Sequence, residues 1–301
     1  MSFDKTRFEE LRLYCEDIVL KYMPVPEGHN AIVTEAMDYS LRAGGKRIRP
    51  ILMLLSYRAF GGSEEVVEPF MAALEMIHTY SLIHDDLPAM DNDDLRRGMP
   101  TCHKKFGEDI AILAGDGLLN YAYEVACKAF IMKPGDVRVE KAMSILASKP
   151  GLNGMLGGQA ADVSLTGKKL SADDINYIYE NKTAALLICA MMIGAVLAGA
   201  SDEDISKIRL AAYAVGMAFQ VQDDIIDMTG DASVVGKEVG QDERNEKYTY
   251  AALHGLDEAK AYVLDMSKKA KDLLEELFSQ RNNKAAEDLT GLIMMLVDRE
   301  K

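Results

Sequence analysis

The chain has 301 residues, and its hydrophobic content of 49% is enough to fill a sizeable core. It carries 34 basic and 48 acidic residues, and the net charge of −14 argues against nonspecific binding to nucleic acid or to anionic membranes. Any anionic ligand must therefore be held by a local group of basic side chains. No linker rich in Pro, Gly or Ser marks a boundary, so we predict a single domain over residues 1–301.

The first half of the chain contains helical periodicities that stop at paired glycines. Apolar residues at a helical spacing fill residues 31–43 and end at Gly44-Gly45, a residue type that commonly terminates helices in a left-handed conformation. Pro50 opens a second apolar run over residues 51–60, and Ser63 then stands where a helix cap is expected. Both runs predict helices.

The second half shows similar helix starts and one long uncharged stretch. Ser171 is followed by Asp174, which is the spacing of a capping box, and Ser201 begins another such start. Residues 183–201 carry no charge, but they are rich in Ala and Gly and directly follow Lys182, so we expect a buried core helix rather than a membrane span. Alternating strands with hairpin turns are absent, and the sequence predicts an all-α fold.

The cysteines and the first residues indicate the compartment. The four cysteines, at positions 15, 102, 127 and 189, lack the paired spacing of a metal site, and the first twenty residues carry too many charges for a signal peptide. We therefore expect a reducing, cytoplasmic environment.

Two aspartate-rich segments each end an apolar run of helical pattern. Their carboxylates are Asp85, Asp86 and Asp91 in the first segment and Asp223, Asp224 and Asp227 in the second. If all six converge on one cavity, each pair repels by roughly 3 kcal/mol at about 5 Å and an effective dielectric constant of about 20. Hard divalent cations that take oxygen ligands, Mg²⁺ first, would relieve this repulsion. The alternative is a solvated surface, as we assume for the Asp pairs at positions 93–94 and 173–174.

The two segments differ in their local geometry. In the second, Gln220 and the three aspartates are spaced i, i+3, i+4 and i+7, so they form one polar stripe on a continuous helix. In the first, Pro88 disfavours a helical Leu87 and is expected to end the helix, so that Asp91 must return from a loop.

Basic residues cluster where a helix is expected to begin. Lys46, Arg47 and Arg49 follow the first glycine pair, and together with the N–H groups of the helix start they could bind a phosphate group. A basic loop that offsets a helix C-terminus is the structural alternative. Arg96-Arg97 follows the first acidic segment, and Lys182 stands out because it enters an uncharged helix.

Several of these motifs occur together in a fixed order. They are residues 44–50 (GGKRIRP), residues 81–98 (SLIHDDLPAMDNDDLRRG), Gly158-Gln159, Lys182-Thr183, residues 219–227 and Gly236-Lys237. In this order, and over almost the whole chain, they resemble the trans-prenyltransferase (polyprenyl synthetase) family, most closely its bacterial-type farnesyl diphosphate synthases. The resemblance implies an isoprenoid-synthase-type bundle of about ten or more helices around a deep central cavity.

The resemblance also implies roles for individual residues. Asp85, Asp86 and Asp91 would bind two Mg²⁺ ions, and Asp223, supported by Asp224 and Asp227, would bind a third, with Mn²⁺ as another possibility. The allylic diphosphate would be held by Arg96, Lys182, Lys237 and Lys247. Isopentenyl diphosphate would be held without metal by Gly45, Lys46, Arg49, His78 and Arg97. Thr183 and Gln220, beside Lys182, would face the reacting carbons.

The helix before Asp85 is where the resemblance places the control of product length. An aromatic residue at Tyr80, about 7.5 Å along the helix from Asp85, is similar to the farnesyl-forming pattern. Helical geometry instead places Ser81 directly below Asp85, so both residues remain candidates.

The expected function is condensation of isopentenyl diphosphate with dimethylallyl and then geranyl diphosphate to give farnesyl diphosphate. It proceeds by Mg²⁺-assisted ionisation, head-to-tail condensation and proton loss. The alternatives are a geranylgeranyl or geranyl diphosphate synthase, a terpene cyclase and a non-catalytic helical subunit. The resemblance further implies a homodimer, and we expect neither a nucleic-acid partner nor stable membrane insertion.

Overall fold

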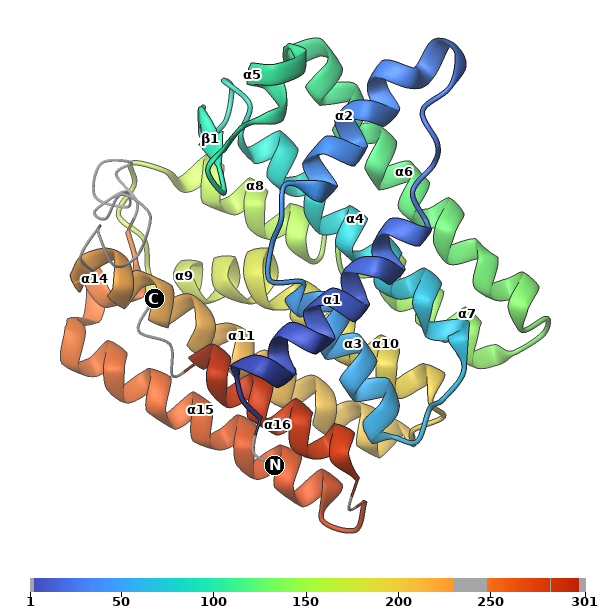
Figure 1. Cartoon of the computed structure of the whole chain (residues 1–301). Coiled ribbons are helices and arrows are strands. Elements are labelled where there is room, and N and C mark those ends of the chain that lie inside the picture. Colours follow the sequence, from blue (N-terminus) through green and yellow to red (C-terminus); the bar gives the residue numbers. More distant parts are fainter. Residues whose placement is uncertain (1–2, 230–247, 282, 298–301) are drawn as a thin grey trace. The chain divides into compact units, whose positions relative to one another are not determined.

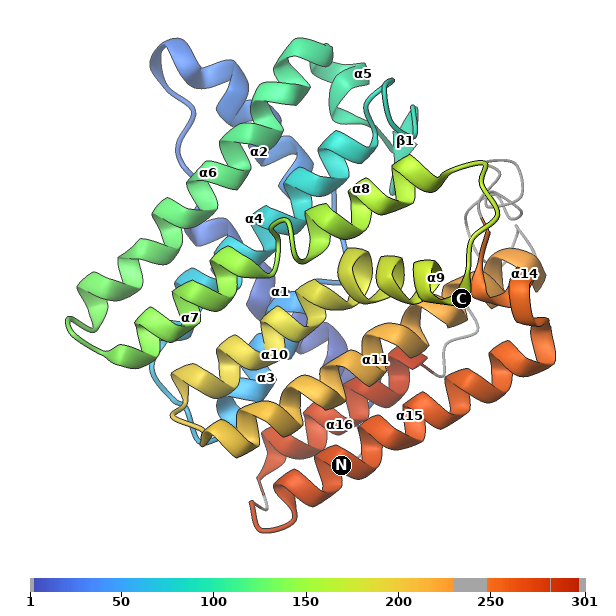
Figure 2. The same cartoon turned by 180° about the vertical axis from the view of Figure 1, so that it is seen from behind.

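The computed structural model describes residues 3–229, 248–281 and 283–297, and these ranges are mostly helical (Figures 1 and 2). The all-α prediction is therefore confirmed. The described residues divide into two compact units, and two of the boundaries between them fall within helices α3 (Ile48–Ala59) and α7 (Val137–Ser148). The N-terminal unit comprises Lys5–Leu54 and Glu64–Met143, and the C-terminal unit comprises Met1–Asp4, Leu55–Ser63 and Ser144–Lys301. A single domain over residues 1–301 stays a prediction.

The N-terminal unit is organised around one buried helix. Its further elements are α1 (Lys5–Lys21), α2 (Ala31–Arg42), α4 (Glu68–Asp85), α5 (Cys102–Phe106), α6 (Glu108–Met132) and 3-10 turns at Gly28–Asn30 and Glu65–Val67. Residues 68–77 of α4 are all buried, and α6 lies alongside α4 (Figure 1). The helices approach closely because α6 presents small residues: a Cβ at Gly115 would lie 2.1 Å from His84 Nε2.

The sequence-based helix ends in this unit are largely confirmed. Helix α2 ends before the glycine pair at 44–45, and α4 ends at Asp85, just ahead of Pro88. The expected capping by Ser63 is wrong, because the 3-10 turn before α4 takes Glu64 as its N-cap and has no side-chain cap. The N-cap position of this turn therefore lies one residue after Ser63.

A small hairpin corrects the expectation that strands are absent. Strands β1 (Leu95–Arg96) and β2 (Met99–Pro100) pair antiparallel, with Arg97 at φ 54° and Gly98 at φ 76° between them. Two positive φ values in a two-residue turn define the tight hairpin type that matches strand twist. The strands are too short to produce an alternating pattern, so only the Arg-Gly pair could have signalled them.

The C-terminal unit contains several long helices and one strongly apolar one. Its elements are α8 (Met155–Leu165), α9 (Ala172–Ile178), the π-helical turn η3 (Tyr179–Ala184), α10 (Ala185–Leu197), α11 (Asp202–Thr229), α14 (Tyr250–His254), α15 (Leu256–Phe278) and α16 (Lys284–Val297). Helices α11 and α15 run side by side (Figures 1 and 2). Both capping predictions hold: Ser171 and Asp174 form a capping box, and Asp204 N donates to Ser201 Oγ at 3.1 Å.

The uncharged stretch is a core helix of this unit. Nearly every residue of α10 is buried, as expected for residues 183–201. Within the described ranges, one helical stretch, Ala172–Leu197, is long and apolar enough to cross a membrane, but 72% of its most apolar window is buried inside the protein. Its apolar surface is thus already covered by neighbouring helices such as α11.

Candidate active site

The first acidic segment lies where α4 ends in the N-terminal unit. The loop after α4 turns back so that Asp91 N donates to Asp85 O at 2.9 Å, which is the return of the chain that Pro88 led us to expect. Asp86 is buried, with 2% exposure, whereas Asp85 is partly exposed and Asp91 is exposed. The three aspartates of this segment therefore lie on one tight turn, although their side chains differ in exposure.

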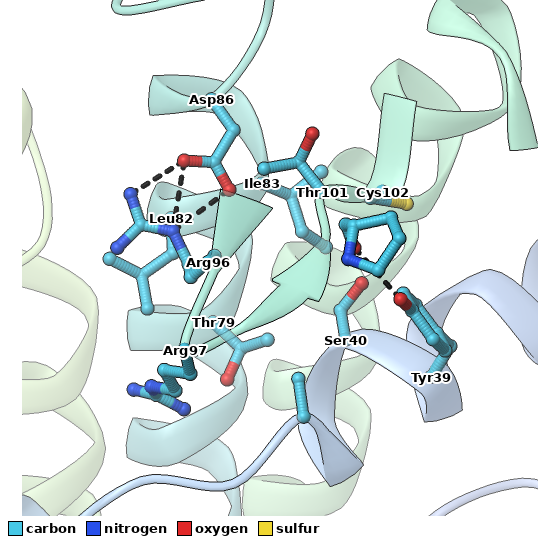
Figure 3. Close-up of a pocket in the computed structure, with 12 residues that line it drawn as sticks. Tyr39, Ser40, Thr79, Leu82, Ile83, Asp86, Arg96, Arg97, Thr101 and Cys102 are labelled. Carbon is cyan, nitrogen blue, oxygen red and sulfur yellow. Dashed lines mark hydrogen bonds and ion pairs between the residues drawn. The ribbon is translucent and has the colours of Figure 1, made fainter. Parts of the chain in front are cut away.

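Arg96 neutralises the buried Asp86. Its Nε lies 2.9 and 2.8 Å from the two Asp86 carboxylate oxygens, and one Nη donates to Oδ1 at 2.5 Å (Figure 3). Burial opposes the charge on Arg96, but the hydrogen bonds to Asp86 and its negative charge outweigh burial and raise the pKa of Arg96. Arg96, which we predicted to bind the allylic diphosphate, is held here by a carboxylate that we predicted to bind a metal. A cation on Asp86 would compete with this guanidinium for the same oxygens.

A small, open recess of about 30 Å³ lies beside this ion pair. Figure 3 shows that Asp86, Arg96 and Arg97 approach it from α4 and from the hairpin, and that Ser40 and Tyr39 approach it from α2. The lining thus combines charged groups with apolar ones such as Ile83. Its charged side chains, rather than its volume, make this recess a candidate contact surface for an anionic ligand.

A cluster of basic groups lies near the start of α3 in the same unit. Burial lowers the pKa of Arg49 to about 10; nearby Glu75 opposes this shift and Arg97 adds to it. The pKa of His78 falls well below its usual value, first through burial and then through the charges of Arg49 and Arg97. Arg49 and Arg97 keep their charge at neutral pH and His78 is neutral there. Such crowded positive charge favours the binding of an anion.

The basic segment divides into a structural residue and ligand candidates. Arg47, which we had grouped with Lys46 and Arg49, has φ 50° and only 2% exposure. It forms a buried ion pair with Glu75 at 2.9 Å and donates to Leu41 O at 2.5 Å. Including Arg47 among the anion-binding side chains was wrong, because its guanidinium points into the unit's core. Within the described ranges, the Nε atoms of both Arg47 and Arg49 are buried without a hydrogen-bond partner, but only Arg47 has its guanidinium paired with a buried carboxylate.

Gly45 allows Arg97 to approach the glycine loop. Gly45 has φ +135°, and a Cβ there would lie 2.6 Å from Arg97 Nη1. Arg97 also donates to Gly44 O. A side chain at position 45 would both strain the backbone and displace the guanidinium. The structure therefore explains why position 45 requires glycine, and the contact of Gly45 with isopentenyl diphosphate stays a prediction.

The C-terminal unit brings its own predicted residues together. Lys182 Nζ lies 2.5 Å from Asp162 Oδ2, and Thr183 Oγ1 donates to Gln220 Oε1 at 2.7 Å. Lys182 and Thr183 stand on the π-helical turn η3, and Gln220 stands on α11. Asp162 was not among the residues predicted from the sequence. The signal that could have found it is its position three residues after the Gly158-Gln159 motif, on the same face of α8.

The second acidic segment lies near the end of α11, and its aspartates differ. Asp224 has 2% exposure and accepts hydrogen bonds from Tyr179 and from the backbone of Tyr250, whereas Asp223 and Asp227 are partly exposed. The continuous helix that we predicted for the polar stripe is confirmed. Lys237 and Lys247, predicted to bind the allylic diphosphate, lie outside the described residues.

The donor chemistry of both segments fits a hard divalent cation, because every candidate ligand is a carboxylate. Within the described ranges, no three His, Cys, Asp or Glu side chains are gathered at the spacing of a metal site. The roles of the six aspartates as metal ligands therefore stay predictions.

The two chain-length candidates of α4 have different surroundings. Tyr80 has 8% exposure, and its ring packs edge-on against His84 with a centroid separation of 5.8 Å. Burial, together with the nearby Tyr123 and Asp85, raises the pKa of Tyr80 to about 12, so its hydroxyl stays neutral. Ser81 is partly exposed and donates to His78 O at 2.9 Å. Tyr80 is thus a buried, bulky group one and a half helical turns from Asp85.

These features, an all-α fold with paired carboxylate and basic clusters, agree with the comparisons to known proteins. A family model for polyprenyl synthetase matches residues 30–293. The chain is 47% identical over 246 residues to the farnesyl diphosphate synthase of Geobacillus stearothermophilus, covering 81% of this chain and 82% of that protein. It is 44% identical over 259 residues to a chloroplastic geranylgeranyl pyrophosphate synthase of Capsicum annuum, covering 85% of this chain and 69% of that protein.

Solved structures give the same result. An FPP/GFPP synthase of Zymomonas mobilis superposes with a TM-score of 0.85 at 30% identity, over 97% of this chain and 98% of that one. A geranyltransferase of Helicobacter pylori, complexed with magnesium and isoprenyl diphosphate, superposes with a TM-score of 0.83 at 29% identity, over 96% and 95% of the two chains. The chain belongs to the polyprenyl synthetase family, and its chemistry is prenyl transfer that elongates a chain.

Proposed function

We propose that this protein is a Mg²⁺-dependent farnesyl diphosphate synthase, which extends dimethylallyl and geranyl diphosphate with isopentenyl diphosphate. One observation carries the proposal: a basic cluster and a carboxylate cluster lie along the same helix. His78 and Asp85 are seven residues apart on α4, which corresponds to about 10.5 Å along the axis and to the same helical face. One diphosphate can be held directly by basic groups and a second one through cations.

The basic cluster binds isopentenyl diphosphate in this proposal. Lys46, Arg49 and Arg97 supply charged donors, and the neutral imidazole of His78 supplies one further hydrogen bond. Isopentenyl diphosphate does not lose its diphosphate in the reaction. Basic side chains can therefore hold this diphosphate directly, and no cation is needed in this pocket. The double bond of this substrate is then the nucleophile.

The carboxylates hold the cations that bind the allylic diphosphate. Asp85, Asp86 and Asp91 would hold two Mg²⁺ ions, and the second segment would hold a third; Mn²⁺ is a possible substitute. When bound, these ions supply the positive charge that stabilises departing pyrophosphate. Arg96 and Lys182 would exchange their present carboxylate partners for oxygens of the same diphosphate.

The remaining residues protect the reacting carbons. The allylic C–O bond breaks, the double bond of isopentenyl diphosphate attacks the allylic carbon, and a proton then leaves to pyrophosphate. Thr183 and Gln220 present oxygen dipoles that are weak nucleophiles, so they can stabilise positive charge without trapping it. Their mutual hydrogen bond fixes the direction of both dipoles.

Product analysis tests the proposal. Purified protein is incubated with Mg²⁺ and geranyl diphosphate, with and without labelled isopentenyl diphosphate, and products are identified by mass spectrometry. We expect farnesyl diphosphate only when both substrates are present. Product formed from geranyl diphosphate alone would identify a terpene cyclase. A lack of pyrophosphate release with both substrates would instead favour a non-catalytic subunit.

Tyr80 is the basis for proposing farnesyl rather than geranylgeranyl diphosphate as the product. We expect Tyr80→Ala to yield longer products, because it removes a buried aromatic ring from the helix below Asp85. Tyr80→Leu is a milder variant, since truncating a buried aromatic residue to Ala costs about 3–5 kcal/mol of stability. Tyr14→Ala, at an exposed position on α1, is the matched control. An unchanged fifteen-carbon product from both Tyr80 variants would show that another group sets the length, Ser81 first.

We also propose a cytoplasmic homodimer. The spacing of the four cysteines, which shows no pairing pattern, supports a reducing compartment. Apolar side chains on α6 support self-association, since Ile112 is 44% and Leu113 is 51% exposed. Light scattering of the purified protein tests the assembly, and a monomer mass would contradict it.

A further inference from the structure

We propose that Asp224 is a positioning residue, which with Tyr179 fixes the turn that carries Lys182 and Thr183, and that metal binding by the second acidic segment falls to Asp223 and Asp227. This inference rests on the proposed function and refines it. It departs from the expectation that Asp224 supports the metal.

The hydrogen bonds of Asp224 carry the argument. Tyr179 OH donates to Asp224 Oδ2 at 2.5 Å, and Tyr250 N donates to the same oxygen at 3.1 Å. Tyr250 N also lies 3.0 Å from Tyr179 OH, so the three groups form a closed triangle. Asp224 is 2% and Tyr179 is 7% exposed. A buried carboxylate is tolerated only when donors satisfy it, and here the donors are groups of the protein itself.

This triangle is one end of a row of contacts between η3 and α11. Tyr179 of η3 is hydrogen-bonded to Asp224 of α11. Thr183, four residues after Tyr179, is hydrogen-bonded to Gln220, four residues before Asp224. Further along, a Cβ at Gly216 would lie 2.3 Å from the Cβ of Ala184. Steps of four residues follow one helical face, so the two segments run antiparallel and in close contact.

The turn η3 depends on these hydrogen bonds and close contacts because of its π-helical conformation. A π-helical turn is rare and is frequently found at functional sites. It is also packed from the opposite side, where a Cβ at Gly158 would lie 2.2 Å from Lys182 N. Loosening the Tyr179 end would shift Lys182 and Thr183, which follow within one turn. The bond to Asp224 therefore positions two groups that we assign to the allylic diphosphate and the reacting carbons.

Asp223 and Asp227 differ from Asp224 in a way that suits a cation. They are spaced i, i+4 on α11 and are both partly exposed. A cation on Asp224 Oδ2 would have to compete with two protein donors for one buried oxygen. The segment thus divides into a buried structural carboxylate and two accessible ones.

Metal-free stability tests the inference without relying on catalysis. Tyr179→Phe, Asp224→Asn and Asp223→Asn are compared by thermal unfolding in EDTA, followed by circular dichroism. We expect the first two variants to lower Tm by about 3 °C or more, and the double variant to fall little further, because both remove the same interaction. Asp223→Asn should leave Tm unchanged or raise it, since it relieves repulsion between carboxylates. A Tm for Asp224→Asn that matches Asp223→Asn would overturn the proposal.

Kinetics separate positioning from a purely structural role. For Tyr179→Phe and Asp224→Asn we expect the KM for geranyl diphosphate to rise at least about fivefold and the half-saturating Mg²⁺ concentration to stay within about twofold. Asp223→Asn should raise that Mg²⁺ concentration about tenfold or more. A lower Tm with an unchanged KM for geranyl diphosphate, or equal Mg²⁺ shifts in Asp223→Asn and Asp224→Asn, would contradict the assignment. If the wild-type protein released no pyrophosphate, the proposed function would be wrong. The comparison of Tm values in EDTA would still test whether the hydrogen bond between Tyr179 and Asp224 stabilises the protein.

Discussion

Replacement of Asp85 by Asn is expected to lower kcat/KM by about 10²–10³-fold, the scale at which loss of one preorganised electrostatic group acts on a charged transition state. Asp85 terminates α4, and the backbone of Asp91 returns to it. Asn keeps the size of the side chain but not its charge, so it holds a divalent cation more weakly. The effect is measured as pyrophosphate release at a Mg²⁺ concentration that saturates the wild-type protein, and additional Mg²⁺ should restore part of the variant's rate.

The matched control for this variant is Asp94→Asn. Asp94 belongs to the neighbouring Asp pair that we assign to a solvated surface, and its side chain is 74% exposed beside Lys104. Its replacement should leave kcat/KM within about twofold, because exposed ion pairs contribute little. Equal losses in both variants would mean that overall charge, rather than a site at the end of α4, governs activity. Full activity of Asp85→Asn would remove this residue from the mechanism.

Arg49→Gln is expected to raise the KM for isopentenyl diphosphate by about 10–100-fold, since hydrogen bonds to charged groups contribute roughly 1.5–3 kcal/mol. The KM for geranyl diphosphate should change little. The reason is the position of Arg49 in the basic cluster with His78 and Arg97, where burial lowers its pKa to about 10 but leaves it charged at neutral pH. Initial rates with each substrate varied in turn provide both constants.

Arg42→Gln is the control for Arg49. It also removes one arginine charge, but Arg42 is an exposed residue at the end of α2 that pairs with Asp38 at 2.8 Å. Both KM values should then remain near those of the wild type. If Arg49→Gln raised the two KM values equally, the cluster would serve both diphosphates, and the division into a metal-free and a metal-dependent pocket would be wrong.

The local features of this chain follow from its sequence because they depend on neighbouring residues. Pro88 ends α4 at Asp85, and Ser171 with Asp174 begins α9. The uncharged stretch after Lys182 becomes the buried α10. Each of these outcomes is set within a few residues, through backbone geometry, capping or apolar periodicity.

The assignment of charged groups to partners could not be read in the same way. Arg96 binds Asp86 ten residues away, Arg47 binds Glu75 across 28 residues, and Tyr179 binds Asp224 across 45. Spacing alone could not show which of Lys46, Arg47 and Arg49 turns inward, because a left-handed backbone at Arg47 decides it. It also could not separate Asp224 from its neighbours on α11.

The sequence by itself determined the all-α class, the helix ends and the two sets of residues that carry charge to the proposed site. Only the tertiary structure decided which of those charges are already satisfied inside the protein, namely Arg47 by Glu75, Asp86 by Arg96 and Asp224 by Tyr179. The physical reason is that an unpaired charge is unfavourable when it is buried. Which group pairs with a buried charge depends on how distant segments pack against each other, and not on the local sequence.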